Sequence, residues 1–107
     1  MDEAQLILEA SKGDLNAFNQ LVLQYQDLIF NQAYALLGDC HSAEDATQKS
    51  FIKAFQKMNR FRSGYFRAWL LRIVINTCYD EIRWTKRHPT IPLIAEDEEG
   101  EGIESPI

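Results

Sequence analysis

The chain has 107 residues and a formal net charge of −5, from 16 acidic and 11 basic side chains. This length predicts one domain, or one module of a longer protein, and 46% apolar residues exclude wholesale disorder. No apolar run reaches the roughly 18 residues of a membrane-spanning helix, so no membrane insertion is expected. The N-terminus lacks the basic start of a secretory signal, and two cysteines cannot form a disulfide framework, so we expect a reducing, cytoplasmic setting.

The charge is unevenly distributed along the chain. Six of the 16 acidic residues lie in the last dozen positions, which contain no Lys or Arg, and residues 1–92 alone carry a net charge of +1. Residues 49–87 hold ten of the 11 basic residues and only two acids, Asp80 and Glu81. A basic segment interspersed with aromatic residues favours a polyanionic partner such as a nucleic acid.

The first two predicted elements are a short helix over residues 2–11 and a long helix over residues 15–37. Apolar residues recur at helical spacing throughout the long segment. Gly13 suits the end of the short helix, Asp14 is a good N-cap for the long one, and Gly38 ends it.

A third helix is predicted over residues 43–58. Ser42 and Asp45 form a variant of the capping box at its start, where the helix dipole favours a carboxylate. Its inner face is predicted to consist of Ala43, Ala46, Ser50, Phe51, Ala54, Phe55 and Met58.

After a break at residues 59–64, a fourth helix is predicted over residues 65–87. Pro89 and Pro92 prevent it from continuing. Its inward residues are predicted to be Phe66, Trp69, Leu70, Ile73, Val74, Thr77 and Cys78. The sequence therefore predicts an all-α fold, a compact bundle of three main helices plus a short leading helix within residues 1–92. Residues 93–107 are acidic and lack a core-forming period, which is typical of a linker or a flexible C-terminal tail.

Neither an enzyme nor a metal site is indicated. The two histidines, His41 and His88, and the two cysteines, Cys40 and Cys78, do not have metal-ligand spacing, and Cys78 falls on the predicted core face. The sequence also lacks a Gly-rich phosphate loop and a nucleophile with a plausible base. We expect no catalytic residue, no metal and no cofactor.

The break before the fourth helix concentrates three aromatic residues and two arginines within seven positions, Phe61 to Arg67, and Trp69 follows closely. One interpretation is a corner between two helices whose aromatic rings fill the core. The other is a surface that takes an unstacked base, because aromatic rings and guanidinium planes stack on bases.

The polar face of the fourth helix has a similar ambiguity. Arg72, Asn76, Tyr79, Arg83 and Arg87 recur at helical spacing, with Trp84 and Lys86 beside them. A solvated charged face would explain the arginines. Asn76 favours a binding role, because asparagine is a poor helix former in mid-helix and can read a base edge.

The outer face of the third helix carries Asp45, Gln48, Lys49, Ile52, Lys53 and Gln56. An exposed Ile52 among charges and amides indicates contact with a partner helix, although isolated exposed apolar residues are normal.

Three strings carry a family resemblance: Ala43-Glu44-Asp45-Ala46-Thr47-Gln48-Lys49-Ser50-Phe51, then Trp69-Leu70-Leu71-Arg72-Ile73 with Asn76, and finally Asp80-Glu81-Ile82-Arg83. In this order they resemble the second region of bacterial RNA polymerase sigma factors of the extracytoplasmic-function (ECF) group. The resemblance covers about residues 3–88.

The resemblance implies a transcription initiation factor that binds RNA polymerase core, and that melts the minus-ten promoter element by capturing a flipped base of the single-stranded non-template DNA. The residues that it implies to dock on the clamp helices of the largest polymerase subunit are Asp45, Gln48, Lys49 and Ile52. The residues that it implies to bind DNA are Arg60, Phe61, Arg62, Ser63, Tyr65, Trp69, Arg72, Asn76, Arg83, Lys86 and Arg87. An anti-sigma factor is a further implied partner.

Two features depart from the family pattern. The family normally adds a helix-turn-helix domain, so we expect this chain to be an N-terminal part, with residues 93–107 resembling the start of the interdomain linker. Lys49 and Ser50 stand where family members often carry an acid and a small apolar residue, which affects the detail of clamp docking. The alternative function is a helical protein–protein adaptor whose basic face meets an acidic partner.

Overall fold

The computed structural model describes residues 2–61 and 64–87. These residues form α1 (Glu3–Ser11), α2 (Leu15–Leu37), α3 (Cys40–Lys57), the short 3-10 helix η1 (Met58–Arg60) and α4 (Phe66–Arg87). The all-α prediction is confirmed, and α2 has the predicted bounds. The predicted acidic tail, residues 93–107, lies outside the described residues.

Local signals fix the ends of α2 as the sequence predicts. The Asp14 carboxylate accepts a 3.2 Å hydrogen bond from the Ala17 amide and so satisfies one of the donors that a helix start leaves unpaired. Gly38 adopts the left-handed conformation, with φ of 75°, and its amide donates to the Tyr34 carbonyl. A glycine adopts this conformation without the steric cost that a side chain would add.

The start of α3 differs from the prediction. The N-cap is Asp39, not Ser42, and its Oδ2 accepts a 2.7 Å hydrogen bond from the Ser42 amide, so Ser42 lies within the first turn. Gly38 ends α2 in the left-handed conformation, and the next residue, Asp39, is extended. The Asp39 carboxylate therefore accepts from the Ser42 amide, and α3 begins three residues earlier than predicted. Hydrogen bonds from the Ser42 hydroxyl and amide hold the pKa of Asp39 below its ordinary value.

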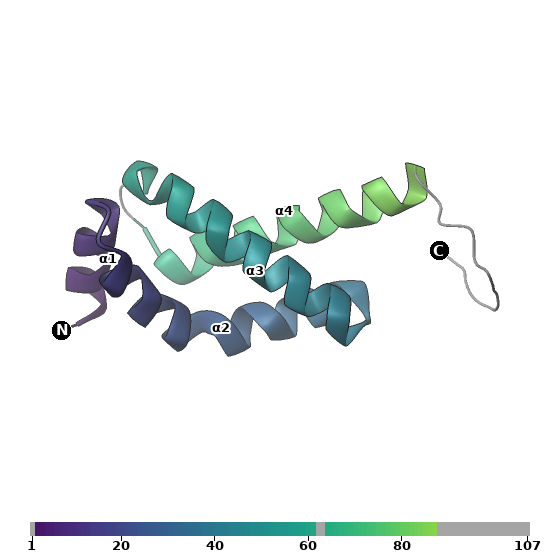
Figure 1. The fold of residues 1–107 in the computed structure, drawn as a ribbon, viewed down its shortest axis with the longest axis horizontal. Coiled ribbons are helices and arrows are strands. Elements are labelled where there is room, and N and C mark those ends of the chain that lie inside the picture. The colour runs from purple at the N-terminus through teal and green to yellow at the C-terminus, as the bar shows by residue number, and fades with distance from the viewer. Residues whose placement is uncertain (1, 62–63, 88–107) are drawn as a thin grey trace.

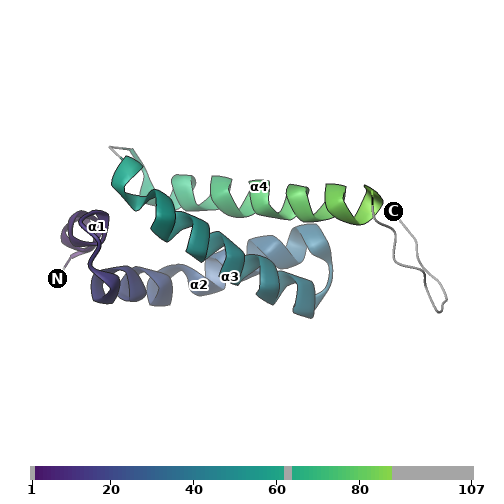
Figure 2. The same cartoon turned by 45° about the horizontal axis from the view of Figure 1, so that its top comes forward.

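Helices α2, α3 and α4 each pack against the other two, and α1 packs against α2 and η1 (Figure 1). The views in Figures 1 and 2 show α1 at one end of the bundle, while the last turns of α4 extend past α2 and α3 at the other end. That end of α4 carries the exposed Trp84, Lys86 and Arg87. No helix in the described part of the chain is long and apolar enough to cross a membrane.

One hydrophobic core joins all four helices and η1. Its buried apolar members are Leu6, Ala10, Ala17, Phe18, Leu21, Ile29, Ala33, Ala43, Ala46, Phe51, Ala54, Met58, Phe66, Leu70, Ile73, Val74 and Cys78. The predicted inner faces of α3 and α4 are confirmed except at Phe55 and Trp69, which are only half-buried. Both are partly buried side chains that pack against this core.

Two polar residues in the described part of the chain, Ser50 and Thr77, are also buried. The Ser50 hydroxyl donates to the Ala46 carbonyl at 2.7 Å, and the Thr77 hydroxyl donates to the Ile73 carbonyl at 2.8 Å. Each hydroxyl therefore has a partner in its own helix, which offsets the cost of its burial.

Candidate nucleic-acid and partner interfaces

The rings of Phe61, Phe66 and Trp69 form a cluster, the aromatic corner, where η1 leads to α4. Ring centroids are 5.6 Å apart for Phe61 and Phe66, 5.2 Å for Phe61 and Trp69, and 5.6 Å for Phe66 and Trp69. Phe66 is buried and serves the core, as the first interpretation of this segment predicted, whereas Phe61 and Trp69 are half-buried. Tyr65 remains 86% exposed, so its ring is available to a ligand. Two further residues predicted to bind DNA, Arg62 and Ser63, lie outside the described residues.

Tyr25 anchors the aromatic corner to α1 and α2. Its ring lies 5.6 Å from that of Phe66, and its hydroxyl donates a 2.7 Å hydrogen bond to Oε1 of Glu3 on α1. Burial raises the pKa of Tyr25 to about 12, and the bond to the Glu3 carboxylate adds to this rise. The Tyr25 side chain, on α2, thus contacts residues of both α1 and α4.

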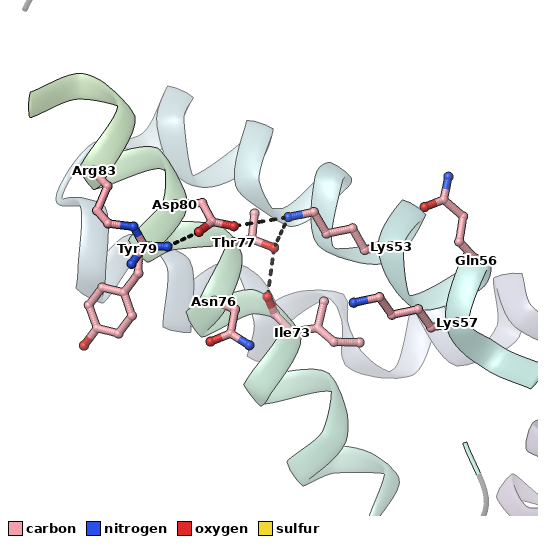
Figure 3. Close-up of a pocket in the computed structure, with 9 residues that line it drawn as sticks. All are labelled: Lys53, Gln56, Lys57, Ile73, Asn76, Thr77, Tyr79, Asp80 and Arg83. Atoms are coloured by element: carbon pink, nitrogen blue, oxygen red, sulfur yellow. Dashed lines mark hydrogen bonds and ion pairs between the residues drawn. The ribbon is translucent and has the colours of Figure 1, made fainter. Parts of the chain in front are cut away.

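A pocket of about 580 Å³ opens between α3 and α4, and we call it the α3–α4 pocket. Figure 3 shows side chains from both helices around it. The lining residues are Lys53, Gln56, Lys57, Ile73, Asn76, Thr77, Tyr79, Asp80 and Arg83. Of the residues predicted to bind DNA, Asn76 and Arg83 line this pocket.

Three pocket side chains form a charged network with Thr77 (Figure 3). The Lys53 Nζ donates to the Thr77 Oγ1 at 3.2 Å and lies 3.9 Å from the Asp80 Oδ2. Arg83 donates to the other carboxylate oxygen of Asp80. Lys53 is thus held between two residues of α4.

This pocket is not apparent from the sequence alone. The sequence places Lys53 and Gln56 on an outer face of α3 that indicates a protein partner, places Tyr79 on the polar face of α4, and indicates no role for Lys57. The available signal was the four-residue spacing of Lys53 and Lys57, which places both on one face of α3. The packing of α3 on α4 then brings that face next to Asn76, which helical periodicity alone does not reveal.

The other predicted DNA contacts are exposed cations that do not line the pocket. They are Arg60 in η1, Arg72 in α4, and Lys86 and Arg87 at the end of α4. Arg72 lies one turn before Asn76 and therefore on the same side of the helix. These positions suit contacts with a backbone that passes over the pocket.

On another face, α2 and α3 enclose an apolar groove of about 550 Å³, the α2–α3 groove. Its lining residues are Leu15, Phe18, Asn19, Val22, Gln26, Thr47, Gln48, Phe51, Ile52, Phe55 and Gln56. Gln48 and Ile52, both predicted to contact the polymerase, lie here, and Ile52 is 59% exposed. Exposed Leu15 and Ile52 together form an apolar surface larger than the single isoleucine visible in the sequence.

The other two residues predicted to contact the polymerase do not line the groove. Asp45 is exposed, one turn before Gln48 and Lys49 on α3. Lys49 turns to the opposite side and donates to Glu81 of α4 at 2.6 Å. The hydrogen bond to Glu81 raises the pKa of Lys49.

Among the described residues, the two cysteines and His41 do not form a metal site. Cys40 is exposed, whereas Cys78 is buried, and burial raises the pKa of its thiol. Within residues 2–61 and 64–87, no three His, Cys, Asp or Glu side chains gather as they would around a metal ion. His88 is outside the described residues.

Comparison with known proteins supports a single family. The model of sigma-70 region 2 matches residues 21–88. The ECF RNA polymerase sigma factor SigW of Bacillus subtilis is 39% identical over 91% of this chain and 51% of its own length. The RNA polymerase sigma-H factor of Pseudomonas aeruginosa is 36% identical, with the same coverage of both chains. This chain therefore spans about half the length of the curated relatives it matches.

A solved structure shares the fold as well. It is the NMR structure of an engineered region 2 of sigmaE in complex with GTAAAA, which matches with a TM-score of 0.79 at 28% sequence identity. The match covers 85% of this chain and 96% of that one. The chain therefore belongs to the sigma-70 region 2 family, and SigW, among its curated relatives, is an ECF sigma factor.

Proposed function

We propose that this domain recognises the minus-ten promoter element as single-stranded DNA and docks on RNA polymerase core. The observation that carries the proposal is the α3–α4 pocket, which holds Asn76 on a fold shared with a region 2 structure bound to GTAAAA. The domain acts by binding alone, with no covalent step. A cytoplasmic location follows from this role.

A base of the non-template strand enters the α3–α4 pocket after it leaves the stack. Asn76 and Gln56 offer amide donors and acceptors to its edge, and the Lys53 ammonium adds a further donor. Unstacking costs a few kcal/mol, while each base stacked on an aromatic ring gains about 1–3 kcal/mol. Tyr65, exposed beside the aromatic corner, supplies such a ring.

The exposed cations hold the strand in place. Arg60, Arg72, Lys86 and Arg87 lie outside the pocket, where they contact phosphates without reading sequence. Phe61 and Trp69 of the aromatic corner extend the proposed DNA surface beside the pocket, and the sequence adds Arg62 and Ser63, which lie outside the described residues. Strand opening follows because the separated strand is bound more tightly than the duplex.

The α2–α3 groove docks on the clamp helices of the largest polymerase subunit. Gln48 supplies polar contacts at its edge, Ile52 supplies apolar area, and Asp45 continues the surface along α3. An anti-sigma factor that covers this groove or the DNA surface would keep the domain inactive.

Selection from a randomised pool of single-stranded decamers tests DNA recognition. The protein is expected to enrich a short motif and to bind it more tightly than a permutation of the same composition or its duplex. An adaptor that uses the basic face for an acidic protein partner would enrich no motif. That result would overturn the proposed function.

A further inference from the structure

We propose that Asp80 determines the specificity of the α3–α4 pocket, by making it accept a nucleobase in preference to a backbone phosphate. This inference rests on the proposed function and deepens it. The carboxylate lies among three basic residues that line the pocket: Lys53, Lys57 and Arg83. Among the described residues, Asp80 is the only acidic one in that lining.

The contacts of Asp80 show which charges it offsets. One carboxylate oxygen accepts from Arg83, and the other lies 3.9 Å from the Lys53 Nζ. Lys53 is also tied to Thr77 at 3.2 Å. Two of the three cations in the pocket are therefore paired, and Figure 3 shows Asp80 between them.

A pocket lined by three unopposed cations would attract any phosphate of a single strand. Such contacts raise affinity without reading sequence, and they release counterions, so they make binding strongly salt-dependent. A carboxylate in the same pocket repels phosphate but tolerates a neutral base, and it can accept hydrogen bonds from exocyclic amino groups. Because Lys53 and Arg83 are both paired with Asp80, the contacts that read the base come from Asn76 and Gln56.

The other nearby acid does not share this role. Glu81, the next residue on α4, is absent from the pocket lining and accepts from Lys49 instead. Consecutive residues of a helix point about 100° apart, which separates the two carboxylates. The proposal therefore concerns Asp80 alone.

Asp80→Asn removes the charge and keeps the shape of the side chain. Because the Asp80 side chain is 56% exposed, the variant is expected to fold like the wild type, as judged by circular dichroism. We expect it to bind the homopolymer (dT)10 about three- to tenfold more tightly at low salt, because two cations become available to phosphates. The slope of log K against log salt should steepen by about 0.7 to 1.4.

Asp27→Asn is the matched control, because it makes the same change in net charge on an exposed residue of α2 that lines neither the pocket nor the groove. It should leave (dT)10 binding and its salt slope near the wild-type values. Equal gains in both variants would show a general charge effect and overturn the proposal. Unchanged or weaker binding by Asp80→Asn would overturn it as well.

A double variant identifies the cation involved. If Asp80 acts by pairing Lys53, then Lys53→Met should remove much of the gain that Asp80→Asn produces on (dT)10. A gain of the same size in the Lys53→Met background would exclude this pairing as the cause.

Different results would overturn the proposed promoter recognition and the proposed role of Asp80. Absence of an enriched motif for the wild-type protein contradicts promoter recognition, whatever Asp80 does on (dT)10. If the wild type does enrich a motif, Asp80→Asn should enrich it less strongly, and equal enrichment by both proteins would overturn the role of Asp80 in specificity.

Discussion

Lys49 on α3 and Glu81 on α4, 32 residues apart in sequence, are joined by a 2.6 Å ion pair between Nζ and Oε2. The resemblance to ECF sigma factors implied that Lys49 contacts the polymerase, yet its ammonium faces a neighbouring helix of its own domain. The same packing of α3 on α4 places Lys53, one turn further along α3, in the α3–α4 pocket. The two lysines thus both take part in the α3–α4 junction.

The Lys49–Glu81 pair is expected to couple the two helices weakly. The side chains are 47% and 40% exposed, so the coupling energy from a Lys49→Met and Glu81→Gln double-mutant cycle should be below about 1 kcal/mol. Urea unfolding measures it, and about 1 M salt should reduce it because the pair is accessible to screening ions. A coupling well above this value would show that the pair is a main support of the fold.

The burial of Tyr25, together with its bond to Glu3, predicts a loss of stability at alkaline pH. Because the pKa of Tyr25 rises from 10.0 to about 12 on folding, its contribution is complete below pH 10 and decreases as the pH rises toward 12. Tyr25→Phe should flatten this decline in the free energy of unfolding between pH 9 and pH 11.5. It should also cost about 0.5–1.5 kcal/mol at neutral pH, because one hydrogen bond is lost.

Tyr34→Phe is the control for this alkaline decline. Tyr34 is 46% exposed, and its ring stacks on Phe30 within α2, away from Glu3. Urea unfolding at each pH should give a wild-type profile for this variant. Parallel profiles for Tyr25→Phe and the wild type would contradict the proposed linkage, whatever the other alkaline titrations contribute.

Most of the fold could be predicted from the sequence because its signals are local. The 3.6-residue period gave the buried faces, and Asp14 and Gly38 marked both ends of α2 correctly. The start of α3 was predicted wrongly because two capping residues, Asp39 and Ser42, compete within four positions. Only the conformation of the preceding turn decides between them.

The site was less predictable because it depends on contacts between helices. Asn76 was identified by its low helix propensity, but its neighbour Lys53 comes from α3, 23 positions earlier. Likewise, periodicity places Lys49 on an outer face of its helix, whereas the packing of α3 on α4 brings it into contact with Glu81. The face of a helix on which a residue lies can be predicted from the sequence, whereas the helix that this face contacts depends on how the helices pack.

Asn76 and Arg72 are expected to affect DNA binding differently although they lie one turn apart. Asn76→Ala should weaken binding to the selected motif by about 1–3 kcal/mol, because a base-edge contact is lost. Binding to the permuted oligonucleotide should be nearly unaffected. Arg72→Ala should weaken both oligonucleotides alike and reduce the salt slope by about 0.7, because it removes one phosphate contact.

Fluorescence anisotropy on the two oligonucleotides distinguishes these outcomes. Lys12→Ala is the control for the arginine, because it removes an exposed cation far from α4 in sequence, just after α1. Equal losses on both oligonucleotides for Asn76→Ala would show that Asn76 does not read a base.

The α2–α3 groove predicts where the polymerase binds. Ile52→Glu places a charge on its apolar surface and should weaken binding to polymerase core at least about tenfold, the effect of losing roughly 1.4 kcal/mol at an interface hot spot. Leu23→Glu is the matched control, since Leu23 is 68% exposed on α2 and does not line the groove. Both substitutions are on the surface and should change the free energy of unfolding by less than about 0.5 kcal/mol. Competition of the 107-residue chain with a labelled sigma factor for core polymerase measures the affinity, and equal affinities of the two variants would show that the polymerase binds elsewhere.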